Sequence, residues 1–338
     1  MKLFTPRFIS LAASALLATT SMAQCLSGDA AAPGGNDPLV GQWAFHWESE
    51  IGLIGVFPSP AAAIGTFDVQ RSPSSNFLTL TGNMTINANG RIYRLAPTGT
   101  RLRGPLAQYQ CIPGTNIIQG GTLQLSDGSF DTMWQFVFKD NNFTEIFMVD
   151  EEFLNPGPNV NLVLKGNAVK FDSAIQTANC NSVPNEMVTN PLTGLPTAWW
   201  SLQSQSVGLP ISGPGILGVG GVAAIGNLVF STASRPGLTG TVSTASSAQP
   251  GLSFSRLAST AGSYGLNACN NIALIPTSIG NGGNMSLMVG PLAVQYEYVF
   301  INNGLSGAYV LSTLATRNSD ANFSFGADAL YGTLNRWN

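Results

Sequence analysis

Charged side chains are scarce in this 338-residue chain. Only 14 residues are Lys or Arg and 17 are Asp or Glu, which makes 9% of the chain charged, against roughly 25% in ordinary soluble domains. The formal net charge is −3, and the chain has a single histidine. So little basic charge excludes the positive surface that nucleic-acid binding needs. One histidine excludes a histidine-built metal centre and makes histidine-dependent acid–base chemistry a poor expectation.

Long apolar runs are also rare, and the clearest one stands at the start of the chain. Lys2 and Arg7 precede the apolar residues 9–18, and the small-residue segment Ser21-Met22-Ala23 follows. This order is typical of a signal peptide cleaved after Ala23. No later stretch offers the roughly 20 apolar residues of a spanning helix. We therefore expect residues 1–23 to be removed and the rest to be secreted, to the periplasm, the cell surface or the medium, without a transmembrane segment.

Cysteine is limited to four residues, Cys25, Cys111, Cys180 and Cys269. In an oxidising compartment an even number of cysteines favours disulfide bonds, and four cysteines allow three pairings. The first two and the last two cysteines each span a loop of about 90 residues, a length for which the chain-entropy model gives up to roughly 4 kcal/mol. The matching spans predict the pairs Cys25–Cys111 and Cys180–Cys269.

The cysteine spacing belongs to a longer internal repeat. Six segments recur in the same order in the second half of the chain: Ala23-Gln-Cys25 as Ala178-Asn-Cys180, Asp37–Gly41 as Asn190–Gly194, Ala62–Gly65 as Ala223–Gly226, Leu80–Gly82 as Leu238–Gly240, Arg94–Ala96 as Arg256–Ala258, and Trp134–Phe138 as Tyr296–Phe300. Chance is a poor explanation for collinear matches. We expect two related domains, residues 24–172 and residues 173–338.

Within each repeat the apolar residues alternate with a period of two. Trp43, Phe45 and Trp47 fall on one face of a strand, and the residues between them fall on the other. Similar short runs occupy residues 77–86, 122–125, 136–138, 146–149 and 296–300, separated by turn signals such as Asn-Gly and Asp-Gly. The pattern predicts an all-β protein of two tandem antiparallel β-barrels, each a meander of about eight strands closed on itself. A pair of β-sandwiches is the alternative.

The opening of the first predicted strand, Gly41-Gln-Trp43, resembles the Gly-x-Trp start of calycin barrels, the lipocalin and avidin group. The resemblance implies that Trp43 and its counterpart Trp200 plug the closed ends of the barrels, with Arg336 of the last strand stacked on Trp200. The second copy departs from the motif, since Trp199-Trp200 follows a longer segment after Gly194. In general character, the segments Trp43–Phe45, Ala62–Phe67 and Trp134–Phe138 are also similar to repeat domains of secreted acidobacterial proteins without an established activity.

The segments after each first strand, residues 51–65 and 207–226, contain no charged residue. Their Gly and Pro content makes them poor helices or strands, and they are apolar for exposed loops. They could complete the barrel core, capture a ligand at the barrel mouth, or contact a second copy of the chain or a lipid surface. The candidate ligand-binding residues are Trp43, Phe45, Trp47, Ile54, Phe57, Trp200, Leu209, Ile216 and Leu217. Inward-facing aromatic residues of a small barrel are also its usual core.

Other polar groups have simpler interpretations than catalysis. His46 has no partner histidine and is expected to be hydrogen-bonded or at the surface. Glu48 and Glu50 could form a glycosidase-like carboxylate pair, but the second repeat has Gln205 and Val207 there. The acidic cluster Asp150–Glu152, with nearby Asp140, lacks calcium-loop spacing and fits a solvated strand end.

These observations together predict a secreted, non-enzymatic binding protein without a cofactor or a metal. It would capture an apolar small molecule or an extracellular polymer through barrel mouths and apolar loops. The alternative is a structural or adhesive surface protein that associates with itself.

Overall fold

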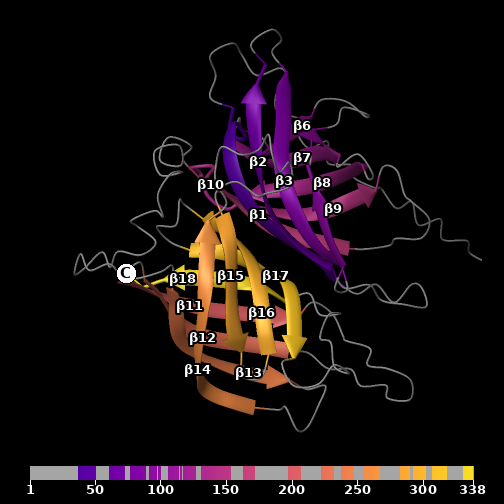
Figure 1. Cartoon of the computed structure of the whole chain (residues 1–338). Helices are drawn as coiled ribbons and strands as arrows, with labels where there is room; N and C mark the ends of the chain where they lie inside the picture. Colours follow the sequence, from indigo (N-terminus) through magenta and orange to yellow (C-terminus); the bar gives the residue numbers. More distant parts are fainter. Residues whose placement is uncertain are drawn as a thin grey trace, which may run out of the picture.

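The computed structural model describes residues 37–50, 61–72, 77–88, 91–96, 98–99, 106–113, 115, 117–126, 131–153, 163–171, 197–206, 222–231, 237–246, 254–266, 282–289, 292–301, 307–317 and 330–337. Every regular element in these ranges is a β-strand. The strands form two sheets that lie next to each other, one built from the first half of the chain and one from the second (Figure 1).

The second half of the chain forms a closed barrel of eight antiparallel strands in chain order, the second barrel. Its strands are β11 (Thr197–Ser206), β12 (Val222–Ser231), β13 (Gly237–Ser246), β14 (Phe254–Leu266), β15 (Gly282–Val289), β16 (Leu292–Ile301), β17 (Gly307–Arg317) and β18 (Leu330–Arg336). Strand β18 closes the barrel by pairing with β11 from Leu330 to Arg336. An up-and-down barrel leaves no sheet edge, so each strand satisfies its backbone on both sides.

The first half forms a strongly curled ten-stranded sheet, the first sheet. Its strands are β1 (Gly41–Glu50), β2 (Ala61–Arg71), β3 (Leu78–Ala88), β4 (Arg91–Leu95), β5 (Thr98–Gly99), β6 (Ala107–Cys111), β7 (Ile118–Ser126), β8 (Asp131–Phe138), β9 (Glu145–Phe153) and β10 (Val163–Phe171). The first strand β1 pairs with the last strand β10, as β11 does with β18. The pairings run through β9, β8, β7 and β5 to β3, which also pairs along its whole length with β2.

The two sheets differ most where the repeat aligns Arg94–Ala96 with Arg256–Ala258. In the second barrel this region is the 13-residue strand β14. In the first sheet it is divided into β4 and the two-residue β5, with Pro97 in the sequence between them. Proline has no N–H to donate to a ladder. Among the described residues, the pairing from β3 to β7 runs through Thr98 and Gly99.

Each sheet encloses its own apolar core, and the alternating pattern explains which residues enter it. Trp43 and Trp200 occupy matching places near the start of β1 and β11, and both are fully buried. In the second barrel Trp200 packs against Phe230 and Phe300. In the first sheet Trp43 stacks on Phe67. Burying such side chains contributes roughly 1.5–3 kcal/mol each.

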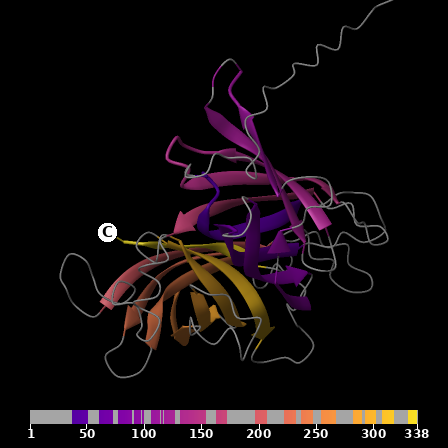
Figure 2. The same ribbon diagram turned by 90° about the horizontal axis from the view of Figure 1, so that it is seen from above.

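The two sheets share a third buried cluster, which joins the outer faces of both. Ala44, Ala62 and Ile64 come from β1 and β2 of the first sheet. Val299, Tyr309 and Leu311 come from β16 and β17 of the second barrel, and the exposed fraction of all six side chains is 2% or less. The view in Figure 2, turned by 90°, shows the strands of the two halves in contact as Figure 1 does. These outer faces are thus an interdomain interface, not a solvated surface.

The predicted all-β class and barrel architecture are confirmed. The expected strands at residues 43–47, 77–86, 122–125, 136–138, 146–149 and 296–300 all lie in observed strands, apart from Phe77, which directly precedes β3. The apolar segments were expected to be loops throughout, and this is wrong for residues 61–65 and 222–226, which begin β2 and β12. No helix able to span a membrane occurs in the part of the chain that the structure describes.

The predicted cleavage site and the boundary between residues 172 and 173 lie outside the described residues, so both stay predictions. Cys111 ends β6, is buried and is disulfide-bonded. Cys25, Cys180 and Cys269 also lie outside the described residues. The pairing of Cys111 with Cys25 therefore stays a prediction.

Candidate binding site in the second barrel

Two buried hydroxyl groups meet inside the second barrel. Ser204 on β11 and Tyr296 on β16 both point inward, and their oxygens lie 3.1 Å apart in a hydrogen bond. The exposed fraction of Ser204 is 1% and that of Tyr296 is 0%. Burial raises the pKa of the Tyr296 phenol to about 12, while the bond to Ser204 acts in the opposite direction. The phenol is therefore neutral at physiological pH, and the pair offers hydrogen bonds without charge.

The first sheet carries large indole rings at the equivalent places. The repeat aligns Ser204 with Trp47 and Tyr296 with Trp134, and both tryptophans belong to the buried core of the first sheet. The second barrel thus has a small hydroxyl group and a phenol where the first sheet has two indoles. The same fold is filled by apolar rings in one copy and carries polar, smaller groups in the other.

The Ser204–Tyr296 pair lies towards one end of the second barrel. Trp200, Phe230 and Phe300 pack together near the opposite end, where β11 begins. Ala224, which lies opposite Ser204 in register, is near the start of β12. Strand β11 ends at Ser206 and β12 begins at Val222, so both of these residues lie at the same end of the barrel as Ser204. In the sequence, the uncharged segment 207–221 connects them. Three aromatic rings thus pack at one end of the barrel, and the small residues Ser204 and Ala224 lie opposite each other towards the other end.

The sequence-predicted ligand-binding residues fall into two groups. Trp43, Phe45, Trp47 and Trp200 face inward and are buried in the two cores, with exposed fractions of 8% or less. The other predicted residues, Ile54, Phe57, Leu209, Ile216 and Leu217, lie outside the described residues. Sequence reasoning did not single out Ser204 or Tyr296. The signal was present, because the repeat alignment pairs each of them with a tryptophan.

A lysine covers the buried tryptophan of the first sheet. The Lys170 Nζ lies 5.0 Å from the centroid of the Trp43 ring and donates a hydrogen bond of 2.9 Å to the Pro38 backbone oxygen. Trp43 in turn donates its indole N–H to the Leu39 oxygen at 2.8 Å. Burial lowers the pKa of Lys170, and Asp37 raises it. Lys170 is on β10, the last strand of this sheet, and the sequence did not predict its contact with Trp43. Arg336, which the sequence did predict to stack on Trp200, lies opposite Trp200 in register.

His46 lies on the outer face of β1, as expected, but the second barrel covers that face. Its ring is 4.4 Å from the Tyr309 ring and 6.3 Å from the Tyr331 ring, measured between centroids. Burial lowers the pKa of His46 to about 4, and the neighbouring Asn167 acts weakly in the opposite direction. The His46 Nδ1, the Asn167 Oδ1 and the Tyr309 hydroxyl are buried without a well-formed hydrogen bond. His46 is therefore neutral and part of the interface.

An acidic side chain of the second barrel also enters the interface. Glu297 on β16 is 1% exposed, and its carboxylate lies 3.5 Å from the Arg94 guanidinium of the first sheet. Burial raises the pKa of Glu297, while Arg94 and Thr85 lower it. Since a buried carboxylate is costly unless it is paired, Arg94 and Thr85 offset the cost of placing Glu297 there.

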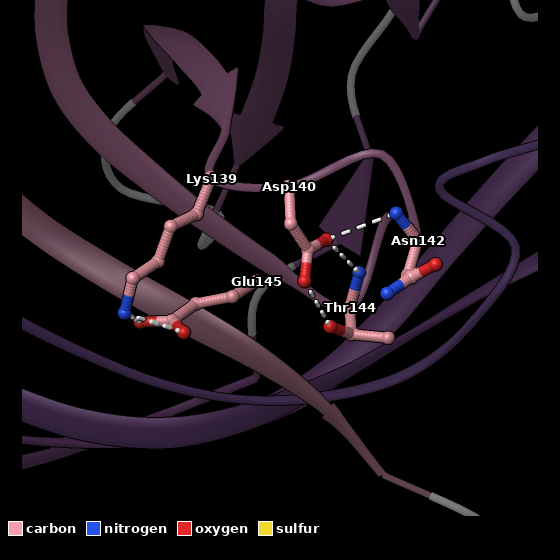
Figure 3. A network of polar contacts seen from close by, with 5 residues as sticks. All are labelled: Lys139, Asp140, Asn142, Thr144 and Glu145. Carbon is pink, nitrogen blue, oxygen red and sulfur yellow. Dashed lines mark hydrogen bonds and ion pairs between the residues drawn. The ribbon is translucent and has the colours of Figure 1, made fainter.

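The acidic residues considered for catalysis or calcium binding have structural partners where they are described. Glu48 pairs with Lys165 at 3.4 Å across β1 and β10. Asp140 organises the turn between β8 and β9, where it accepts hydrogen bonds from the Asn142 and Thr144 backbone N–H groups and from the Thr144 hydroxyl (Figure 3). Beside it, Lys139 and Glu145 form an ion pair at 2.9 Å. Within the described ranges, no three His, Cys, Asp or Glu residues are grouped to hold a metal ion.

No protein-family model matches the chain, and no curated protein is similar to it. Among solved structures, a protein from Nitrosomonas europaea with the provisional name ATTH is similar over 88% of this chain and 92% of its own, with 8% sequence identity and a TM-score of 0.25.

Proposed function

We propose that the protein is an exported, non-enzymatic binding protein whose second barrel holds an apolar small molecule near Ser204 and Tyr296. One observation carries the proposal, namely that the second barrel has two hydroxyl groups where its sister sheet has the two indoles of Trp47 and Trp134. Eight-stranded barrels have an interior wide enough either for side chains alone or for one small ligand. The smaller side chains favour the second possibility.

The chemistry around the pair defines the ligand class. Leu202, Ala224, Val242 and Val294 belong to the same buried cluster and are apolar. Ser204 and Tyr296 supply one neutral hydrogen-bonding point between them. Ligand sites of this type combine an apolar lining with a few polar groups that set orientation. The expected ligand is an uncharged apolar molecule with a single hydroxyl or carbonyl group. The sequence that connects β11 to β12, residues 207–221, is also uncharged.

A titration of the full chain with Nile red tests the proposal. We expect saturable binding with about one probe bound per chain, and displacement by long-chain alcohols more readily than by alkanes. The Ser204→Trp substitution installs the side chain of the first sheet and should abolish binding. Thr239→Trp places the same ring on the exposed outer face of β13 and should leave binding unchanged. An absence of saturable binding to the native chain, or equal binding by Ser204→Trp, would contradict the proposal.

A conservative variant separates a lost site from a damaged fold. Tyr296→Phe keeps the ring and removes one hydroxyl group. Because a neutral hydrogen bond contributes roughly 0.5–1.5 kcal/mol, affinity for the alcohols should fall about 2- to 10-fold while affinity for alkanes holds. An equal loss for both classes would indicate a general packing effect.

Self-association is a second candidate function, and one surface of the first sheet favours it. Val137 on β8 lies opposite Phe147 on β9, and Val149 follows on the same face. The exposed fractions of the three side chains are 47%, 47% and 40%. Exposed apolar patches often mark protein interfaces. Sedimentation velocity over a range of concentrations tests this, since Phe147→Ser should lower any dimer fraction and Tyr93→Ser, at another exposed aromatic residue, should not.

A further inference from the structure

Two tryptophans stack on the outer surface of the second barrel. The Trp199 and Trp337 rings lie 5.9 Å apart between centroids at an angle of 27°, and their exposed fractions are 44% and 51%. Tryptophan is large and apolar and is highly buried on average. Two half-exposed indoles in contact are therefore an arrangement that folding alone does not require.

The exposed pair is held in a fixed position. The Trp337 backbone N–H donates to the Trp199 oxygen at 3.0 Å, which extends the ladder of β18 and β11 by one residue. The Trp337 indole N–H donates to the Ser201 hydroxyl, so both the ring and its polar atom are anchored. A ligand that stacks on these rings would pay little entropy for ordering them.

Among the described residues, the outward side chains of β11 and β18 next to the pair are uncharged and rich in hydrogen-bonding groups. Ser201 lies opposite Asn335, and Gln203 lies opposite Thr333, along the outward rows of β11 and β18. We call the six residues Trp199, Ser201, Gln203, Thr333, Asn335 and Trp337 the neutral strip. Ile225, 59% exposed and opposite Gln203 on β12, adds apolar surface at its edge.

The lack of charge extends over all three strands. Strands β11, β12 and β18 contain one charged residue, Arg336, which lies opposite the buried Trp200 and so on the inward row. A polyanion or a nucleic acid would need basic groups, and an anionic lipid surface would too. The neutral strip offers ring faces, amides and hydroxyl groups instead.

We propose that the neutral strip binds a neutral polysaccharide. Sugar rings present a C–H face that packs on an indole, and equatorial hydroxyl groups that pair with amide and hydroxyl side chains. The strip combines both features on the outer surface of two paired strands, with the rings at one end and the neutral polar side chains in line after them. It lies outside the barrel, so this site is separate from the ligand site at Ser204 and Tyr296, and each proposal can fail without the other.

Affinity electrophoresis of the full chain in gels containing soluble β-glucan, xylan or galactomannan tests this, with polygalacturonate as the charged comparison. We expect at least one neutral polymer to retard the protein, and 0.5 M salt to leave the retardation unchanged, because salt screens only charge-based contacts. Trp199→Ala and Trp337→Ala should each weaken binding roughly 10-fold, the size expected for losing one aromatic contact. Tyr93→Ala removes an exposed ring from the other sheet and should have no effect.

A second variant and a second readout make the outcome decisive. Gln203→Ala keeps both rings and should weaken binding a few-fold, while the thermal unfolding midpoint stays within the range of the native chain. Retardation by no neutral polymer would overturn the proposal, as would equal binding by the tryptophan variants or retardation only by polygalacturonate at low salt. Dimerisation that Trp337→Ala abolishes would overturn it too, because it would assign the strip to a second copy of the chain.

Discussion

Asn87 of the first sheet donates a hydrogen bond of 2.8 Å from its Nδ2 to the backbone oxygen of Ser312 in the second barrel. Both residues are buried, with exposed fractions of 3% and 1%. The Ser312 hydroxyl in turn accepts a hydrogen bond from the Leu330 N–H at 2.9 Å, which ties β17 to the start of β18. The interface is therefore connected by hydrogen bonds to the pairing that closes the barrel.

Replacing Asn87 should weaken both halves of the protein together. In Asn87→Ala the Ser312 oxygen loses a buried donor, which costs about 1–3 kcal/mol. We expect urea unfolding, followed by tryptophan fluorescence and by far-UV circular dichroism, to show one shared transition moved to lower urea. Asn142→Ala, in the exposed β8–β9 turn, is the control and should be close to neutral. Two separate transitions in the native chain would contradict this coupling.

His46 should make the protein less stable in acid. Its pKa of about 4 in the folded protein is below the ordinary histidine value of 6.5, so between these values the unfolded chain binds more protons than the folded one. The contribution of His46 to the free energy of unfolding is fully present above pH 6.5. It is lost as the pH falls towards 4, by about 3 kcal/mol in total. The groups that face it are Asn167, Tyr309 and Tyr331.

The measurement is the free energy of unfolding of the native chain and His46→Asn at several pH values from 7 to 4. The difference between the two should shrink as the pH falls. Glu297 has a raised pKa and gives an opposite trend, since its folded form holds a proton more strongly than its unfolded form. It contributes equally to both proteins and cancels in the difference. Parallel curves for the two proteins would show that His46 does not titrate in this way.

Lys170 should stabilise the first sheet more than Lys165 does, although both lie on β10. Lys170→Met removes the cation–π contact with Trp43 and the hydrogen bond to Pro38, together worth about 1–3 kcal/mol. Lys165→Met removes a pair with Glu48 in which the lysine side chain is 49% exposed, and exposed pairs contribute about 0–1 kcal/mol. Urea unfolding of both variants measures the contrast, and equal losses would argue against a special role for Lys170.

The adjacent residues Trp199 and Trp200 should respond very differently to truncation. Trp200→Ala opens a cavity in the core of the second barrel and should cost about 3–5 kcal/mol, since the side chain is fully buried. Trp199→Ala removes a half-exposed ring and should cost about 1 kcal/mol or less. Thermal unfolding of the two variants provides the comparison. Similar losses would mean that the outer tryptophan pair is part of the structural core.

Sequence reasoning identified the strands and their inner faces because alternation with a period of two directly reports which side chains face a core. It did not identify the interface. Ala44 and Ile64 lie on outer faces, and alternation does not tell whether another domain covers such a face. A signal was available in β2, where residues 61–65 are all buried and apolar on both faces, as is usual for strands covered on two sides.

The functional candidates were harder to predict for a different reason. Ser204 and Tyr296 are unremarkable residues on their own, and they gain meaning only from the comparison with Trp47 and Trp134 in the sister sheet. Lys170 and Trp337 acquire their roles from pairing between strands far apart in the chain. Such contacts depend on how the ends of a barrel meet, which local patterns do not specify.

The two-residue strand β5 is a weak connection between β3 and β7 in the first sheet. Among the described residues, three residue pairs connect β3 to β7 through Thr98 and Gly99, whereas eleven residue pairs connect β2 to β3. Local unfolding begins where the fewest hydrogen bonds must break. We therefore expect the first sheet to open locally at β5 while the second barrel remains folded. In native-state hydrogen exchange, we expect the amides of Thr98 and Gly99 to take up deuterium before the other described strand amides of the first sheet, so the two halves of the protein would differ in local stability at the position of β5.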